Sequence, residues 1–265
     1  MFDPYNRRID YLRISVTDKC NLRCVYCMPE EGVPLIRHED VLRFEEIVEV
    51  TRRAVALGVM KVRVTGGEPL VRRGIVTLVS MLGQIKGIAD LAMTTNAVRL
   101  AEFARPLADA GLERVNVNLV ALDSVRYAEI TRGGDVRDVL EGIRAARAAG
   151  LAPIKLNCVI QKTPDEPDAR AVAAYAAEEG LEVRFIRRMN LAIGDFSVVI
   201  GGTGGDCPRC NRLRLTCDGM VRPCLFSDLG FNVRELGPEE AIRRAVLYKP
   251  KCGRTSERLF HTIGG

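Results

Sequence analysis

The sequence predicts an α/β protein whose parallel sheet is curled into a full or partial barrel, followed by a small cysteine-containing region. Two observations favour this class. From residue 10 to 188, short β-branched runs alternate with stretches of helical period. Repeated strand–helix units of this kind are typical of parallel sheets with helices outside them. In addition, several strands carry polar residues on one alternating face and aliphatic residues on the other, which predicts a polar concave interior.

The expected strands are short runs rich in β-branched residues. They span Tyr11–Thr17, Lys61–Thr65, Leu91–Thr95, Arg114–Leu119, Ile154–Ile160 and Glu182–Ile186. The expected helices have apolar residues three and four positions apart. They span Phe44–Leu57, Ile75–Ile85, Leu100–Ala110, Val136–Ala149 and Asp168–Glu179. Most of these helices are followed directly by a glycine, where a C-terminal cap is expected.

Composition narrows the class of protein. At 265 residues, the chain is long enough for one large α/β domain and a small appendage. Its net charge of +5, from 39 basic and 34 acidic residues, is too small to indicate a nucleic-acid partner. We expect no membrane contact, because there is no apolar run of about eighteen residues and no secretory leader. The nine cysteines are then expected to be metal ligands rather than disulfides, in a cytoplasmic protein.

The polar strand face carries the cations. Parallel sheets are normally covered on both faces and consist of nearly continuous apolar runs. Here helices would cover the aliphatic face only, although a sheet with one face simply exposed to water is the alternative. The cations on the polar face are Arg13, Arg63, Lys155 and Arg184. A cavity lined by these side chains indicates a large anionic ligand.

A loop with three cysteines follows the first expected strand. Cys20, Cys24 and Cys27 have the spacing C-x3-C-x2-C, with an aromatic residue just before the last cysteine. Such a loop can ligate three irons of a 4Fe–4S cluster and leave the fourth open for substrate chemistry. The loop resembles that of the radical S-adenosylmethionine (SAM) enzymes. A structural zinc knuckle is the alternative, but three cysteines without a nearby fourth ligand fit a closed tetrahedral site poorly.

The expected organisation has three parts: a barrel over residues 1–190, a short glycine-rich connector over 191–206, and a C-terminal region over 207–265. In the last part, Asp218-Gly219 between two alternating runs indicates a hairpin. The hairpin would return Cys224 towards Cys207 and Cys210 and so form a second site with three thiolates. A zinc ribbon that only stabilises a small domain is the alternative.

Strand alternation assigns the faces of this hairpin. It places Arg212 and Arg214 on one face and Leu213, Leu215 and Cys217 on the other. Cys217 is therefore not expected to be a ligand. By the same argument, Cys158 is expected to be buried on the helix-covered face of its strand.

The chain resembles the GTP 3′,8-cyclase family of molybdenum cofactor biosynthesis, also called the molybdenum cofactor biosynthesis protein A family. The matching stretches are Asp10–Pro29, Arg63–Leu70, Thr94–Asn96, Ile130–Gly134, Arg184–Ile186 and Cys210–Thr216. The terminal Gly264-Gly265 also matches. The second cysteine group with its Asn-Arg-Leu-Arg insert separates this family from other radical SAM enzymes. Asn118, Val120 and Ala97 differ from the family pattern.

The resemblance implies a partial (β/α)6 barrel of the radical SAM superfamily with two 4Fe–4S clusters that face each other across a cavity. Cys20, Cys24 and Cys27 would hold the cluster that binds SAM, and Cys207, Cys210 and Cys224 the second. The residues implied near SAM are Tyr26, Gly66, Gly67, Glu68, Asn118, Arg184 and Met189. A tight strand-to-helix connection is the alternative role of the Gly66-Gly67-Glu68 turn.

The positions implied to bind GTP are Arg13, Arg63, Thr94, Lys155, Arg212 and Arg214. Arg13 is also the implied catalytic residue, as a proton donor or phosphate clamp. The implied reaction is that of a radical SAM lyase, which converts GTP to (8S)-3′,8-cyclo-7,8-dihydroguanosine 5′-triphosphate. An external one-electron reductant is required, and the resemblance suggests a homodimer and the next enzyme of the molybdopterin pathway as partners. A paralogous two-cluster enzyme acting on another nucleotide or a peptide, and a non-catalytic metal-binding module, are the alternatives.

Overall fold

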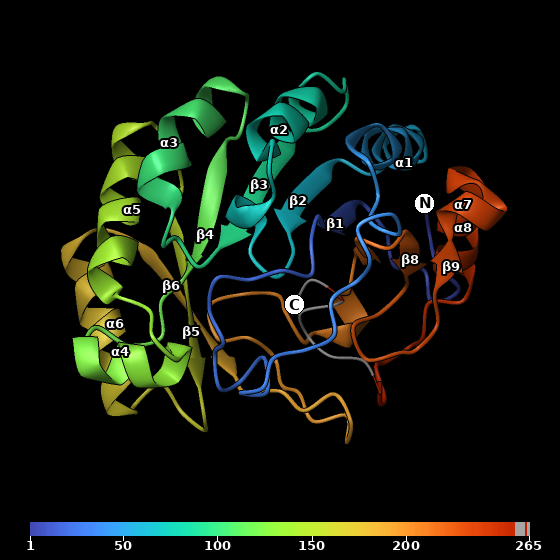
Figure 1. Cartoon of the computed structure of the whole chain (residues 1–265). Helices are drawn as coiled ribbons and strands as arrows, with labels where there is room; N and C mark the ends of the chain where they lie inside the picture. Colours follow the sequence, from blue (N-terminus) through green and yellow to red (C-terminus); the bar gives the residue numbers. More distant parts are fainter. Residues whose placement is uncertain (258–262, 264–265) are drawn as a thin grey trace.

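A single mixed sheet organises the protein. The computed structural model describes residues 1–257 and 263 (Figure 1). The strand order is β6-β5-β4-β3-β2-β1-β7-β8-β9, and the sheet is not closed. Its first six strands are parallel and follow the chain order, as the sequence predicts for a partial (β/α)6 barrel. They are β1 (Tyr11–Ser15), β2 (Lys61–Thr65), β3 (Asp90–Thr95), β4 (Arg114–Asn118), β5 (Lys155–Ile160) and β6 (Glu182–Arg187).

Helices cover the outer face of this sheet (Figure 1). Those that the sequence predicts are α1 (Phe44–Ala56), α2 (Ile75–Gly83), α3 (Leu100–Asp109), α5 (Val136–Ala148) and α6 (Pro167–Glu178). The aliphatic strand faces are buried beneath them, and Cys158 is fully buried there as expected. Among the described residues, no helix is long and apolar enough to cross a membrane.

The sequence did not predict one barrel helix, α4 (Ser124–Thr131). Its periodic signal is weak, because only Tyr127 and Thr131 are buried. Local chemistry defines its ends: the Asp123 side chain accepts a hydrogen bond from the Arg126 amide at the N-terminus, and Arg132 adopts a left-handed conformation, with φ of 55°, at the C-terminus. A short 3-10 turn, η1 (Pro69–Val71), was also not predicted.

The C-terminal region extends the barrel sheet. It consists of η2 (Cys207–Arg209), β7 (Arg212–Leu215), β8 (Met220–Arg222), β9 (Phe231–Asn232), α7 (Val233–Leu236) and α8 (Pro238–Leu247). Strands β7 and β8 form the predicted hairpin, with Gly219 at a φ of 87° in its turn. The sequence did not predict that β7 pairs in parallel with β1. This pairing places the second cysteine group at the open side of the barrel.

The connector over residues 191–206 is folded back on itself rather than extended. Ile200 and Phe185 exchange two backbone hydrogen bonds, of 3.0 and 3.1 Å, so the connector adds to the free edge of β6. Phe196 from the connector packs on Phe226, with ring centroids 4.4 Å apart, next to a small separate core. The connector therefore forms part of the wall around the barrel interior.

The packing of α5 against the start of α3 leaves no room for a side chain at Gly142. A Cβ atom there would lie 2.5 Å from the carbonyl oxygen of Ala97 and 3.0 Å from Cβ of Leu100. Ala97 itself adopts a left-handed φ of 63°, a conformation that favours glycine over residues with a Cβ atom.

We therefore expect Gly142→Ala to lower the free energy of unfolding by about 1–3 kcal/mol through overpacking. This sign is diagnostic, because Gly→Ala inside an unobstructed helix stabilises by roughly 0.5–1 kcal/mol. Urea unfolding followed by circular dichroism measures the change. Glu141→Ala, at the exposed neighbouring position, is the control and should change stability little. Stabilisation of the Gly142 variant would show that the contact with Ala97 is not as tight as described.

Candidate active site

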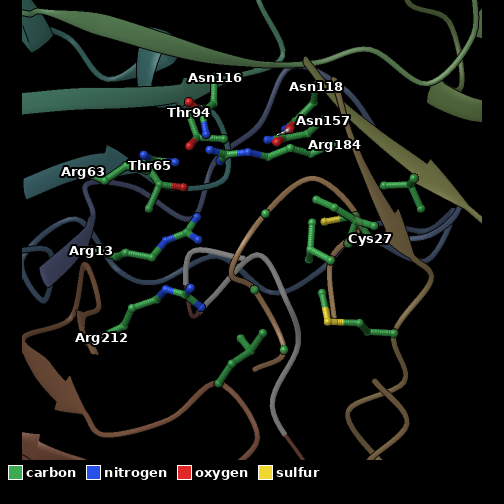
Figure 2. Close-up of a pocket in the computed structure, with 18 of the residues that line it drawn as sticks. Arg13, Cys27, Arg63, Thr65, Thr94, Asn116, Asn118, Asn157, Arg184 and Arg212 are labelled. Carbon is green, nitrogen blue, oxygen red and sulfur yellow. Dashed lines mark hydrogen bonds between the residues drawn. The ribbon is translucent and has the colours of Figure 1, made fainter. Parts of the chain in front are cut away.

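A cavity of about 520 Å³ occupies the concave side of the sheet. Both predicted cysteine groups line it: Cys20, Cys24 and Cys27, together with Cys207, Cys210 and Cys224. Figure 2 shows Arg13, Arg63, Arg184 and Arg212 pointing into the space on one side, with Cys27 on the other. The two groups are therefore brought to one cavity from parts of the chain nearly two hundred residues apart, as the sequence analysis expected.

The first cysteine loop is held by the end of α4. Arg132 donates from one guanidinium nitrogen to the carbonyl oxygens of Arg23 and Met28, at 2.9 Å each. Backbone amides of Arg23 and Val25 donate to the carbonyls of residues 131 and 130. The left-handed conformation of Arg132 is thus part of the loop's support. Helix α4, which the sequence did not predict, therefore helps to fix the shape of the predicted cysteine loop.

A buried carboxylate connects the barrel strands to this loop. Glu68 accepts hydrogen bonds from the Leu70 amide, the Thr95 hydroxyl and the Asn96 amide, at 3.0, 2.7 and 2.7 Å. The Asn96 side chain in turn donates to Asn21 Oδ1 at 2.8 Å and to Cys20 Sγ at 3.9 Å. Burial raises the pKa of Glu68 to about 7, although the three donors favour its charged form. Glu68 therefore aligns the cysteine loop in addition to lining the cavity.

The Gly66-Gly67 turn has a structural reason as well as its implied functional one. A Cβ atom on Gly67 would lie 2.3 Å from the Lys19 carbonyl oxygen, and one on Gly66 would lie 2.8 Å from that of Thr17. The Gly67 amide donates to the same Thr17 oxygen at 2.7 Å. Both glycines are thus required for the close approach of this turn to the segment that leads into the cysteine loop.

The donor set of the first group suits an iron–sulfur cluster. Thiolates are the ligands that such clusters use. Burial raises the pKa of Cys20 to about 11 and that of Cys27 to about 12, and it also raises the pKa of Cys24, whose thiol is hydrogen-bonded to the Tyr26 side chain. Metal loading would therefore release protons from these thiols. Within residues 1–257 and 263, no three Cys, His, Asp or Glu side chains form a site for a single metal ion.

A buried ammonium supports the second cysteine group. Lys249, only 3% exposed, donates to the carbonyl oxygens of Arg212 and Pro223 at 2.7 and 2.5 Å. These carbonyls lie beside Cys210 and Cys224 in the chain. Burial alone would raise the pKa of Cys210, but the charge and hydrogen bond of Lys249, with the Arg212 amide and charge, lower it overall. Lys249 therefore fixes both arms of the hairpin and favours a thiolate at this group.

Three arginines stand side by side on adjacent strands. In the parallel register, Arg13 of β1 lies directly beside Arg63 of β2 and Arg214 of β7. Burial, followed by repulsion from Arg212, lowers the pKa of Arg214 to about 10, and burial followed by the charge of Arg214 lowers that of Arg13. Two unit charges about 5 Å apart repel by roughly 3 kcal/mol at an effective dielectric constant of about 20. We call these three residues, Arg63, Arg13 and Arg214, the arginine row, and they place three cationic side chains together on the cavity wall.

Some buried polar atoms near the row have no hydrogen-bond partner in the described part of the protein. Among the described residues, Nε of Arg63, Nε of Arg184 and Oγ1 of Thr94 are buried without a hydrogen-bond partner. Buried polar groups are normally paired, so such atoms indicate a ligand or water that completes them. Arg212 also lines the cavity and donates to the Thr203 carbonyl and hydroxyl of the connector, at 2.7 and 2.9 Å.

The prediction that Lys155 lines the cavity is wrong. Lys155 does point to the inner side of β5, but its ammonium pairs with Glu182 on the neighbouring strand at 2.5 Å, and it is not among the residues lining the cavity. The alternation rule gives the face of a strand but not how far along it the cavity extends. All the residues predicted to lie near SAM line the cavity: Tyr26, Gly66, Gly67, Glu68, Asn118, Arg184 and Met189.

Several further residues line the cavity for which the sequence predicted no role in the site. They are Lys61, Thr65, Asp90, Asn96, Arg114, Asn116 and Asn157. Most lie on the polar strand faces, so the alternation pattern contained the signal. Figure 2 shows Thr65, Asn116 and Asn157 with Asn118 around the arginines. Lys249 had no such signal, since its role depends on carbonyls distant in sequence. Cys217 lies fully buried on the opposite face of the hairpin, and Gly264-Gly265 lie outside the described residues.

Comparisons with known proteins agree on one family. The sequence profile of the radical SAM superfamily matches residues 14–176. Three similar curated proteins, each called GTP 3′,8-cyclase, come from Pelotomaculum thermopropionicum, Moorella thermoacetica and Thermodesulfovibrio yellowstonii. The first two are 42% and 40% identical to this chain over 100% of both lengths. The third is 39% identical over 93% of this chain and 92% of its own.

Solved structures share the fold at low identity. Streptococcus suis SuiB bound to precursor peptide SuiA superposes with a TM-score of 0.69 at 14% identity, over 94% of this chain and 66% of SuiB. The protein anSMEcpe, with bound AdoMet and the Cp18Cys peptide, gives a TM-score of 0.64 at 14% identity, over 96% and 88% of the two chains.

The support role of Lys249 predicts that Lys249→Met is destabilising. Two buried carbonyl oxygens would lose their donor, at about 1–3 kcal/mol each. Urea unfolding of the metal-free protein measures this loss. Lys251→Met, two residues away and exposed, is the matched control and should stay close to the wild type. Equal stability of the two variants would contradict the role assigned to Lys249.

The raised pKa of Glu68 predicts a specific pH dependence of stability. A carboxyl whose pKa is about 7 when folded, against an ordinary 4.5, stabilises the fold fully below pH 4.5. This contribution, about 3 kcal/mol, is lost as the pH rises to 7, because the unfolded chain ionises first. The difference in unfolding free energy between wild type and Glu68→Gln in the metal-free protein should therefore fall over this range. The exposed control Glu141→Gln should show a constant difference, and a constant difference for Glu68→Gln would refute the assignment.

Proposed function

Because this chain belongs to the GTP 3′,8-cyclase family of the radical SAM superfamily, we propose that its cavity binds GTP between two 4Fe–4S clusters. The reaction is the conversion of GTP to (8S)-3′,8-cyclo-7,8-dihydroguanosine 5′-triphosphate, the first step of molybdenum cofactor biosynthesis. The observation that supports this best is the arginine row beside two three-cysteine groups in a single cavity. A triphosphate offers enough charged oxygen atoms to accept hydrogen bonds from several of these guanidinium groups at once.

Membership of the radical SAM superfamily implies one 4Fe–4S cluster and SAM. We assign Cys20, Cys24 and Cys27 to this cluster. When bound, the reduced cluster and SAM supply a 5′-deoxyadenosyl radical that removes hydrogen from the ribose 3′ carbon of GTP. Glu68 keeps acceptor capacity beyond its three donors and would receive the methionyl ammonium. The remaining proposed SAM contacts are Tyr26, Gly66, Gly67, Asn118, Arg184 and Met189.

We also propose that the second cysteine group holds a 4Fe–4S cluster. Its ligands would be Cys207, Cys210 and Cys224, supported by their common place in the cavity and by the Lys249 charge beside Cys210. A cluster held by these three cysteines would have one iron without a protein ligand, open to a group of the substrate. Thiolates favoured by a neighbouring ammonium bind metal with a smaller proton release than unassisted thiols.

The triphosphate would be held by Arg13, Arg63, Arg212 and Arg214, with Thr94 beside them. Arginine suits this task because its planar fork meets two phosphate oxygens at once and keeps its charge when buried. Arg13, at the centre of the row, is the proposed proton donor or phosphate clamp. Lys155 is left out of the phosphate site because Glu182 already neutralises it. The four arginines and Arg184 all line the cavity, and a peptide substrate would not require so many cations there.

An external one-electron reductant is required by this chemistry, since the first cluster must be reduced before SAM is cleaved. We further propose that the protein forms a homodimer and passes its product to the next enzyme of the molybdopterin pathway.

Anaerobic turnover with reconstituted protein, SAM, dithionite and GTP is the direct test, read by mass spectrometry. We expect GTP to stimulate formation of 5′-deoxyadenosine and to yield a cyclised isomer of GTP. Cys24→Ala should abolish 5′-deoxyadenosine formation altogether, because the SAM cluster loses a ligand. SAM cleavage at one slow rate, with or without GTP, would leave the superfamily assignment intact but reject GTP as the substrate.

The arginine row predicts opposite effects of Arg63→Met on stability and on binding. Burial, with the charges of Arg114 and Arg184, lowers the pKa of Arg63, so replacing this cation by an apolar side chain should leave the metal-free protein as stable as the wild type or more stable. GTP affinity should fall by about 10- to 100-fold, because charge-assisted hydrogen bonds to phosphate are worth roughly 1.5–3 kcal/mol. Calorimetric titration with GTP measures the affinity. Arg52→Met, on the exposed face of α1, should change neither property; a stable variant with unchanged affinity would remove Arg63 from the site.

A further inference from the structure

A fourth cysteine touches the second cysteine group. Sγ of Cys252 lies 3.1 Å from Sγ of Cys207, and all nine cysteines of the chain are free thiols. The two partners differ in surroundings: Cys207 lines the cavity, whereas Cys252 is exposed to solvent and is not among the cavity-lining residues. The pair therefore joins a ligand position inside the cavity to a thiol that small oxidants in solution can reach.

The fold holds this pair together through a buried arginine. Arg7 donates to the carbonyl oxygens of Cys207 and Lys251 at 2.8 and 2.9 Å, and to that of Pro250 at 2.7 Å. Asp3, itself buried, fixes the guanidinium at 2.6 Å. One side chain thus ties the backbone of Cys207 to the two residues that precede Cys252. The contact between the sulfurs is a consequence of this clamp.

The segment after Cys252 is equally constrained. A Cβ atom at Gly253 would lie 2.6 Å from Cβ of Phe226 and 3.3 Å from Sγ of Cys224. The chain from 250 to 253 therefore runs against two cysteines of the second group. Two sulfurs in contact cannot bind different corners of one cluster unless one of them moves away. Cys252 is thus placed to react with Cys207 rather than to serve beside it as a further ligand.

We propose that Cys207 and Cys252 form a reversible disulfide that closes the second cysteine site to metal under oxidising conditions. The proposal rests on the two-cluster function proposed above. A disulfide sulfur–sulfur bond is about 2.05 Å long, so the two atoms need to approach by about 1 Å. Oxidation would remove one of three ligands from the cavity, and reduction would restore it.

Hydrogen peroxide is the oxidant class that completes the chemistry. One thiolate of the pair attacks a peroxide oxygen, the O–O bond breaks, and a sulfenic acid forms with release of hydroxide, which takes up the proton lost by that thiol. The second thiol then displaces water from the sulfenic acid and forms the S–S bond. Overall, two thiols and hydrogen peroxide give one disulfide and two waters. A dithiol reductant reverses the result by thiol–disulfide exchange.

The test begins with the full chain freed of iron by a chelator under anaerobic conditions. The protein is treated with one equivalent of hydrogen peroxide, alkylated and digested with trypsin without reduction. Cleavage separates the critical cysteines, since Cys207 falls in 189–209, Cys210 in 210–212 and Cys252 in 252–254. We expect the peptides 189–209 and 252–254 to be joined, and to separate after dithiothreitol. Joining of Cys207 to Cys210, or no joined peptide, would overturn the proposal.

Iron incorporation gives the second readout. Untreated wild type should take up about eight iron atoms per chain, and peroxide-treated wild type about four until it is reduced. Cys252→Ser should keep about eight after the same peroxide treatment and removal of excess oxidant. A Cys252→Ser protein that loses iron as the wild type does, or that takes up only about four before treatment, would reject the switch. Untreated wild type with only about four would reject the two-cluster function instead, while the peptide map would still report on the disulfide.

Discussion

The placement of three arginines side by side on adjacent strands is the constraint on which the interior of this protein depends. Three guanidinium groups on neighbouring strands cannot be separated without breaking the register of β2, β1 and β7. Each is desolvated by the sheet and its surroundings, as their lowered pKa values indicate. The register of the sheet therefore places three positive charges on one part of the cavity wall. An anionic ligand in the cavity would meet several guanidinium groups at once, so the row is suited to bind a polyanion.

The stability of the fold comes mainly from the outer face of the sheet. Aliphatic side chains of every barrel strand pack there against helices, whereas the inner face has polar side chains in place of a core. A parallel sheet with a polar inner face departs from the usual pattern. Because the apolar core lies on the outer face, the side chains on the inner face can be polar or charged without loss of core packing.

Much of this division could be predicted from the sequence, and the failures have local causes. Alternation gave the faces of Arg13, Arg63, Arg184, Arg212 and Arg214 correctly, because the period of a strand depends only on its backbone. It could not show that Lys155 would find Glu182, since that pair depends on the register of β5 with β6. Nor could it show β7 beside β1, because the partner of a short hairpin is decided by tertiary contacts. The helix α4 was missed because capping rather than amphipathicity defines it.

The second cysteine group is held in place by residues that lie far from it in the sequence as well as near it. Arg7, near the start of the chain, donates to carbonyls 200 and 244 residues away, and Lys249 joins the segments on either side of the hairpin turn. Both are buried cations whose donors satisfy carbonyl oxygens that would otherwise be unpaired. The geometry of Cys207, Cys210 and Cys224 therefore depends on contacts between both ends of the chain. A metal site built in this way depends on the tertiary fold and not on residues 207–224 alone.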